Sequence, residues 1–128
     1  MSGIEMIAKE RARQVAIEDW SPEHDKQHAS GELAWAAVCY AAPAPIFIQM
    51  RGPLRVAFVD PWPSEWASRW DKRPKKAGSY ALAEPTEAER LRMLIKAGAL
   101  IAAEIDRLTE QHNAESNGRA SDPTRTPG

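Results

Sequence analysis

The chain has 128 residues, of which 43% are hydrophobic, and a formal net charge of −1, so its length suits one domain with a modest core. The near-neutral charge argues against a general nucleic-acid-binding surface. Cys39 is the single cysteine, which excludes an intramolecular disulfide and suits a reducing compartment. The sequence shows neither the apolar core of a signal peptide nor an apolar run that could cross a bilayer, so we expect a location in the cytoplasm.

The first 42 residues predict helices. Apolar residues recur at helical spacing over residues 4–18. A serine–proline pair at residues 21–22 is typical of a second helix start, because serine accepts hydrogen bonds from backbone N–H groups and proline tolerates the first helical position. Gly31 either breaks this second helix or lies within it, and both alternatives are open. Residues 32–42 are alanine-rich and apolar on every side, which predicts a helix in the middle of the fold.

The middle of the chain, residues 43–85, reads as an irregular insertion. β-Branched and aromatic residues flank Gly52 and Pro53, and this pattern predicts a β-hairpin within residues 46–59. Three tryptophans follow at four-residue spacing, which one or two helical turns would place on one face. These are Trp62, Trp66 and Trp70.

The clearest element begins after Thr86, which forms a T-x-x-E capping box with Glu89 and starts a helix over residues 87–111. Its apolar residues have the alternating three- and four-residue spacing of a core stripe. They are Leu91, Leu94, Ile95, Gly98, Ile101, Ala102, Ile105 and Leu108. The polar residues 113–128 predict a disordered tail. The expected fold class is mainly α, a small helical bundle within residues 1–112 in which the helix from Glu87 packs on the helix from Glu32.

A polar cluster precedes the apolar helix. If the helix is continuous through Gly31, then His24, His28 and Glu32 follow one another on one face, with Asp25 beside them. Such a set can bind a divalent metal or hold a ligand without metal. It can equally be a solvated helix start, which is the more common case, and the sequence leaves these alternatives open.

Glu104 is a lone carboxylate in an otherwise apolar segment, just as Glu32 opens the other apolar helix. If the two helices pack together, Glu32 and Glu104 can meet and bind Mg²⁺, a cation that takes few protein ligands and keeps several waters. The alternative is that Glu104 lies half-exposed beside the core stripe, where glutamate is a good helix former.

A second candidate site would hold a small phosphorylated ligand. Trp20 and the three spaced tryptophans offer stacking surfaces, although tryptophans at such spacing more often only cover helices. Four cations of the insertion suit phosphate groups. They are Arg51, Arg55, Lys72 and Arg73. The polar cluster could then contact sugar hydroxyls or base edges.

Two stretches carry a family resemblance. They contain Trp20, Glu23, His24, Asp25, His28, Gly31, Glu32, Leu33, Cys39 and Tyr40 in the first stretch and Lys96, Gly98 and Glu104 in the second. The chain resembles a widespread group of small phage and prophage proteins of unassigned function. The resemblance implies an accessory protein acting in the bacterial host cytoplasm and implies no reaction.

A weaker similarity joins the chain to all-helical nucleotide pyrophosphohydrolases of the MazG type. Those enzymes hold magnesium with E-x-x-E on one helix and E-x-x-D on another. Only Glu32 and Glu104 stand in comparable places here, and the second acid of each pair is missing, which counts against a working hydrolase.

From these observations we expect a non-catalytic accessory protein that binds a nucleotide-like ligand or signal and so counters host functions. The alternatives are a metal-dependent pyrophosphohydrolase and a protein–protein inhibitor of a host defence factor. We also expect a homo-oligomer, because the alanine-rich core is thin and the chain has five tryptophans to cover.

Overall fold

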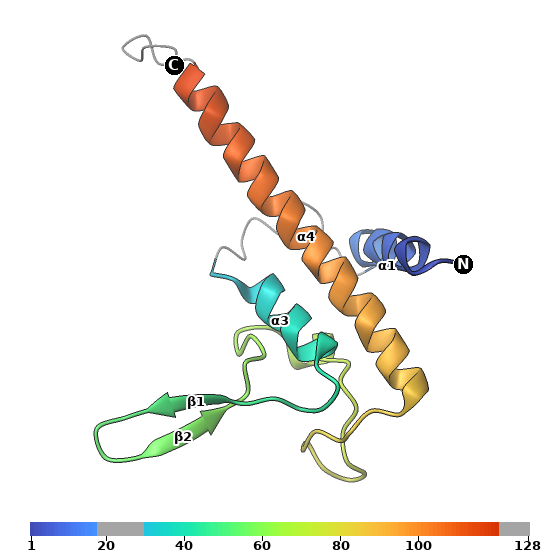
Figure 1. Ribbon diagram of the computed structural model, residues 1–128, viewed down its shortest axis with the longest axis vertical. Coiled ribbons are helices and arrows are strands. Elements are labelled where there is room, and N and C mark those ends of the chain that lie inside the picture. Colours follow the sequence, from blue (N-terminus) through green and yellow to red (C-terminus); the bar gives the residue numbers. More distant parts are fainter. Residues whose placement is uncertain (18–29, 121–128) are drawn as a thin grey trace.

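A computed structural model describes residues 1–17 and 30–120 and shows a mainly helical fold with one β-hairpin (Figure 1). Its helices are α1 (Gly3–Ile17), α3 (Glu32–Ala41) and α4 (Glu87–Ala120). The strands β1 (Ile48–Arg51) and β2 (Val56–Val59) form the hairpin, and a short 3-10 turn, η1 (Ser68–Trp70), follows. The mainly helical fold class is confirmed. No described helix is both long and apolar enough to cross a membrane.

α4 is the central element, and both other described helices pack on it. As predicted, α3 packs against α4, and the end of α3 lies beside the start of α4, where Arg90 Nη1 donates a hydrogen bond to the Ala41 carbonyl over 3.2 Å. Small side chains let these two helices approach closely. Leu33 and Leu100 are the largest side chains that are fully buried. The shared core contains Leu33, Ala36, Ala37, Tyr40, Trp66, Met93, Ala97, Leu100 and Ala103.

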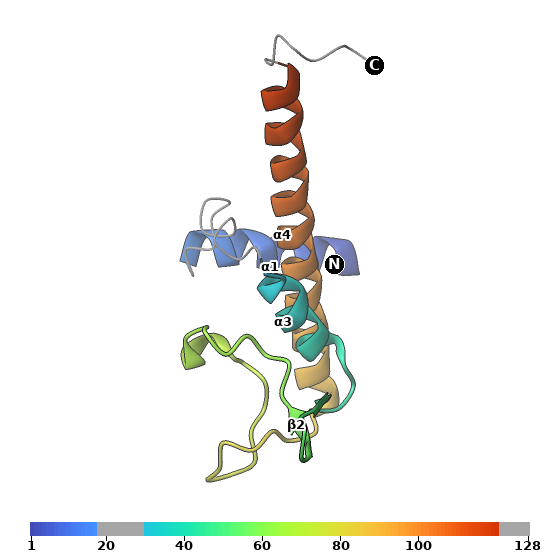
Figure 2. The same cartoon turned by 90° about the vertical axis from the view of Figure 1, so that its left-hand side faces the viewer.

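α1 crosses α4 on a different side from α3 (Figure 2). The crossing point is Gly98, where a Cβ atom would lie 2.5 Å from Ile7 Cδ1. Glycine is therefore needed at this position because the two helices are in close contact. Glu10 connects the helices, since its carboxylate pairs with Lys96 Nζ at 3.3 Å and with Arg13 Nε at 2.7 Å.

The predicted core stripe of the last helix is wrong. Five of its members are exposed: Leu91, Leu94, Ile101, Ile105 and Leu108. The buried face is instead the neighbouring one, with Met93, Ala97 and Leu100, because its alanines allow α3 to pack closely. The predicted end near Gln111 is also wrong, since α4 continues to Ala120.

Local capping signals fix where the two core helices begin. The capping box is confirmed, since Thr86 N–H donates to Glu89 Oε1 over 2.9 Å and Glu89 N–H donates to Thr86 Oγ1 over 3.2 Å. Gly31 has a φ of 85°, a left-handed conformation that glycine adopts without strain. The chain is thus not helical through Gly31, and the continuous-helix alternative for Glu32 is excluded.

The predicted second helix and several of its proposed ligands cannot be compared with the structure. Residues 18–29 lie outside the described residues. They include Trp20, His24, Asp25 and His28.

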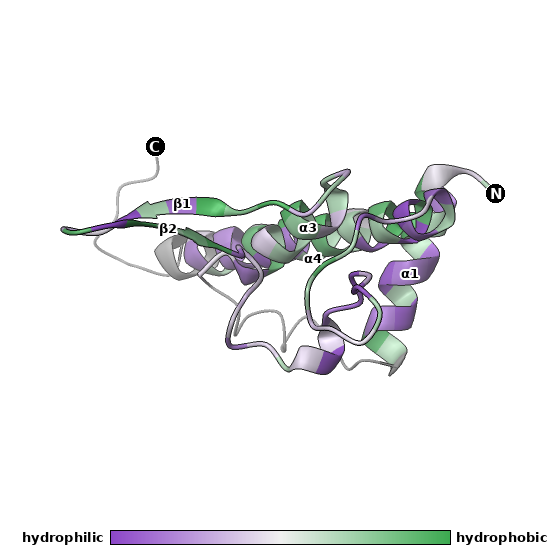
Figure 3. Ribbon diagram, turned by 90° about the horizontal axis from the view of Figure 1, so that it is seen from below, coloured by the Kyte–Doolittle hydropathy of each residue, from purple (hydrophilic) through white to green (hydrophobic). Residues whose placement is uncertain are grey.

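The β-hairpin is confirmed, with Ile48 opposite Val59 and Arg51 opposite Val56 in antiparallel register. It extends away from the helices, and Figure 3 shows apolar residues along both strands. Its turn is closed by the Gly52 N–H, which donates to the Arg55 carbonyl over 2.9 Å.

Candidate functional site

The three spaced tryptophans belong to a loop, residues 60–76, that covers α3; we call it the tryptophan loop. Their rings form a row with Tyr40 of α3, each meeting the next edge to face. The centroid distances are 5.3 Å for Tyr40–Trp62, 5.6 Å for Trp62–Trp66 and 5.4 Å for Trp66–Trp70. Such pairs stabilise a fold beyond the area that they bury.

The prediction of one or two helical turns that stack the tryptophans is largely wrong, because only Ser68–Trp70 forms a turn of 3-10 helix. Pro61 and Pro63 flank Trp62, and proline disfavours a helical conformation in the residue before it. Trp66 is 7% exposed. A base can therefore stack on Trp66 only if the loop rearranges, and the packing role of the tryptophans is the one that the structure shows.

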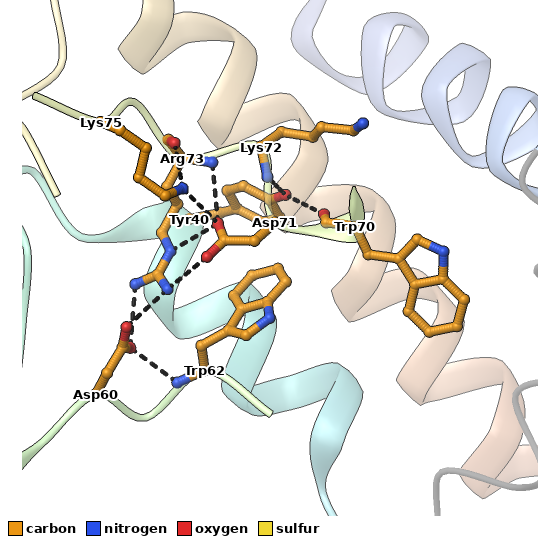
Figure 4. A network of polar contacts seen from close by, with 8 residues as sticks. All are labelled: Tyr40, Asp60, Trp62, Trp70, Asp71, Lys72, Arg73 and Lys75. Atoms are coloured by element: carbon orange, nitrogen blue, oxygen red, sulfur yellow. Dashed lines mark hydrogen bonds and ion pairs between the residues drawn. The ribbon is translucent and has the colours of Figure 1, made fainter. Parts of the chain in front are cut away.

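Arg73 is the charged centre of the tryptophan loop (Figure 4). Its Nη1 and Nη2 atoms donate to the Asp60 carboxylate over 3.1 and 2.8 Å. Its Nε and Nη2 atoms donate to the Asp71 carboxylate over 3.0 and 2.8 Å. The guanidinium carbon also lies 5.0 Å from the centroid of the Trp62 ring. Two carboxylates and a ring thus already surround this side chain.

The opposite charges of Arg73 and of the carboxylates of Asp60 and Asp71 stabilise one another. Burial acts to lower the pKa of Arg73, but its hydrogen bonds with Asp71 and Asp60 outweigh burial and raise it above its ordinary value. Burial likewise acts to raise the pKa of Asp60, but the hydrogen bonds from Arg73 and from the Trp62 N–H, together with the charges of Arg73 and Lys75, outweigh it and lower the pKa. Both groups are therefore held in their charged forms. Such a cluster fixes the loop and leaves Arg73 unsuited to a phosphate contact.

Tyr40 ties the same loop to α3. Its hydroxyl donates to the Trp70 carbonyl over 3.0 Å and accepts from the Lys72 N–H over 2.9 Å. Sequence reasoning missed the roles of Tyr40, Asp60 and Asp71. The available signal was the Asp71-Lys-Arg73 spacing, which lets a carboxylate bond its second neighbour along a loop.

The two lone carboxylates lie on helices that pack together, but each has its own contact. Glu104 Oε1 accepts from Arg107 Nε over 2.6 Å. Glu32 Oε2 accepts from the Ser30 N–H over 3.2 Å. Within residues 1–17 and 30–120, no group of three or more His, Cys, Asp or Glu side chains is placed to hold a metal. The predicted divalent-cation site stays a prediction, because His24 and His28 lie outside the described residues and the pair of Glu32 and Glu104 is not a group of three.

Cys39, expected to be inert packing, is buried in α3. Burial raises the pKa of its thiol to about 11, although the charge of Arg73 acts to lower it. A thiol with such a pKa is almost wholly protonated at neutral pH and is a poor nucleophile. We assign it no chemical role.

Two surfaces of the described residues are candidate binding surfaces. The first is the hairpin, whose exposed apolar side chains are Phe47, Met50, Leu54, Val56, Phe58 and Val59. It also carries the predicted site residues Arg51 and Arg55, both exposed. The second is a hollow of about 190 Å³ beside the start of α4. Its lining is Lys72, Pro74, Glu89, Arg92, Met93 and Lys96.

Comparison with known proteins assigns neither surface a function. No protein-family model, no curated protein and no solved structure matches the chain.

Proposed function

We propose that the protein is a non-catalytic binding protein whose hairpin docks on an apolar surface with an acidic rim on another protein. One observation carries this proposal: the hairpin is apolar but packs on none of the described helices. Every residue of β2 is exposed, and Phe58 is 69% exposed. A two-stranded hairpin alone is barely stable in water, so a partner that covers it gains both affinity and order.

The charge of the hairpin indicates the chemistry of the partner. Between residues 46 and 59 the charged side chains are Arg51 and Arg55, and no acidic residue is present. Both arginines lie at or beside the turn, next to the exposed Leu54. Arginine and aromatic side chains are the residues that most often dominate binding energy at protein interfaces. The partner should therefore present carboxylates around an apolar centre.

This proposal corresponds to one alternative from the sequence, an accessory protein that blocks a host factor by contact. Sequestration or blocking needs affinity and surface complementarity but no reactive group. The resemblance to small phage proteins supports a target in the bacterial host. The enzyme alternative has no further support from the described residues, because its carboxylates Glu104 and Glu32 are engaged in local contacts.

Cross-linking from chosen positions tests the docking surface. We would place a photoreactive phenylalanine analogue at position 58, and in a control at position 80, where Tyr80 is an exposed aromatic residue outside the hairpin. After irradiation of bacterial cells, position 58 should cross-link one host protein through an acidic region, and Arg55→Glu should abolish the product. Equal cross-linking from position 80, or none from position 58, would contradict the proposal.

A small phosphorylated ligand is a second candidate, and the hollow beside α4 favours it. Three cations line this hollow against a single carboxylate, Glu89. Lys72 and Arg92 are exposed, whereas Lys96 also pairs with Glu10. The volume of about 190 Å³ is smaller than a site for a whole drug-sized ligand. The hollow thus suits a phosphate group whose remaining parts lie outside it.

This candidate predicts that ligand is carried through purification. Small molecules released from the denatured protein would be analysed by mass spectrometry, for the wild type and for Lys72→Gln with Arg92→Gln. Lys76→Gln is a matched control, because Lys76 is an exposed lysine of the same loop outside the hollow. A phosphorylated compound that is lost only from the double variant would support this site. Wild-type protein that carries no phosphorylated compound would count against it.

A further inference from the structure

A third face of α4 carries a stripe of exposed apolar side chains, which is interrupted where Ile7 of α1 packs on Gly98. α3 and α1 pack on two other sides of this helix. The stripe consists of the side chains at positions 91, 94, 101, 105 and 108, which are between 41% and 56% exposed. With Gly98 included, the spacing is three, four, three, four and three residues, which is the heptad pattern of a coiled coil. Single exposed apolar residues are common, but a row at this spacing indicates a contact surface.

We propose that this stripe binds the same stripe of a second copy of the chain, with the two α4 helices antiparallel. The stretches outside the described residues are too polar to cover it. Trp20 is the only large apolar residue in residues 18–29, and residues 121–128 contain none. A helix with the same heptad spacing is the natural complement, and two-fold dimers are the commonest closed assembly.

Charge selects the antiparallel direction. Residues 87–98 contain three cations and two carboxylates, whereas residues 99–116 contain one cation and four carboxylates. A parallel pair would place the two acidic halves side by side. An antiparallel pair places each acidic half beside the more basic half of its partner, which favours association and fixes direction.

One register pairs the exposed residues on either side of the α1 crossing. It places Leu91 opposite the second copy's Leu108 and Leu94 opposite its Ile105, and the same offset places Ile101 opposite Gly98, which Ile7 of that copy covers. The line continues to Glu87 opposite His112, a carboxylate and an imidazole that can hydrogen-bond at each end. Near the start of α4 the stripe is open to solvent at Leu91 and Leu94, so side chains of the second copy can reach it.

The mass of the purified protein in solution tests the dimer. Sedimentation velocity over a range of concentrations should show a dimer, and Ile105→Asp should weaken association about a hundredfold or more, because symmetry introduces the charge twice. Val38→Asp is the matched control, since Val38 is a similarly exposed apolar residue on α3, and it should leave association unchanged. Circular dichroism establishes whether each variant is folded. If Ile105→Asp is unfolded, Leu108→Asp is used in its place.

Cysteine pairs test the direction. A variant with both Leu91→Cys and Leu108→Cys should form disulfide-linked dimers under mild oxidation, whereas each single change should not. These positions are 17 residues apart, about 25 Å along one helix, so they cannot pair within one chain. Disulfide-linked dimers from either single variant would show parallel pairing. A wild-type monomer at high concentration, or a dimer that survives both Ile105→Asp and Leu108→Asp, would overturn the proposal.

Discussion

At the scale of single residues, the contacts of Arg73 with Asp60 and Asp71 indicate a structural role and not that of a phosphate ligand. An arginine in a basic run next to tryptophans is a reasonable phosphate ligand from sequence alone. In the structure its side chain is 5% exposed and its donors are directed to Asp60 and Asp71. Removing one partner of such a buried pair leaves an uncompensated charge, whose cost exceeds that of a lost surface contact.

Arg73→Met should therefore destabilise the protein by about 3–5 kcal/mol. The measurement is the free energy of unfolding from urea denaturation, followed by tryptophan fluorescence. Arg55→Met is the matched control, because Arg55 is exposed on the hairpin, and it should change the free energy of unfolding by less than about 0.5 kcal/mol. Equal small effects of the two changes would show that the cluster does not hold the loop.

At the scale of elements, sequence reasoning succeeded where the signal was local. The capping box, the hairpin turn and the apolar α3 each depend on a few neighbouring residues, and each is confirmed. The choice of buried face on α4 was wrong, because it depends on the partner. Alanines at 97 and 103 admit α3, while the larger Leu and Ile residues that give the stronger periodic pattern remain outside.

The close contact between α1 and α4 predicts that a destabilising substitution on one helix is partly compensated by a second substitution on the other. Gly98→Ala should destabilise the protein by about 1–3 kcal/mol, although alanine is the better helix former, because its Cβ would displace Ile7. Combining it with Ile7→Ala should cost less than the sum of the two single changes. Gly3→Ala is the control, since nothing lies within 4 Å of its added Cβ. A stabilised Gly98→Ala protein would contradict this packing.

The contact between the same helices predicts a dependence on pH. Burial acts to raise the pKa of Glu10, but its hydrogen bond with Arg13 and the charge of Lys96 outweigh burial and lower it. A carboxyl group whose folded pKa lies below its unfolded value stabilises the fold above the unfolded value, and this is lost as pH falls through the folded value.

Glu10→Gln should therefore be less stable than the wild type near neutral pH, and the difference should shrink below about pH 4. Urea denaturation of both proteins across this range measures the difference. Other carboxyl groups titrate in both proteins and so largely cancel from the comparison. A difference that stays constant or grows toward acid would refute the assignment of this contact.

At the scale of the whole molecule, the predicted ligand site divides between parts with different roles. The structure brings the three spaced tryptophans together with Arg73, as the sequence suggested, but uses them to cover α3. It places Arg51 and Arg55 on the hairpin and Glu104 beside Arg107. Sequence spacing could not foresee this, because the contacts of these side chains depend on Tyr40, which belongs to α3, and on Asp60, which lies at the other end of the loop from Arg73.

The proposal that the hairpin serves binding and not folding is tested most directly by the stability of a hairpin variant. The free energy of unfolding would be determined for a variant with Phe47→Ser and Phe58→Ser, beside Leu100→Ala as a core reference. The free energy of unfolding should change by no more than about 1 kcal/mol in the double variant and should fall by about 2–5 kcal/mol in Leu100→Ala. A loss in the hairpin variant as large as that of Leu100→Ala would contradict the claim, because it would place these aromatic side chains in the folded core.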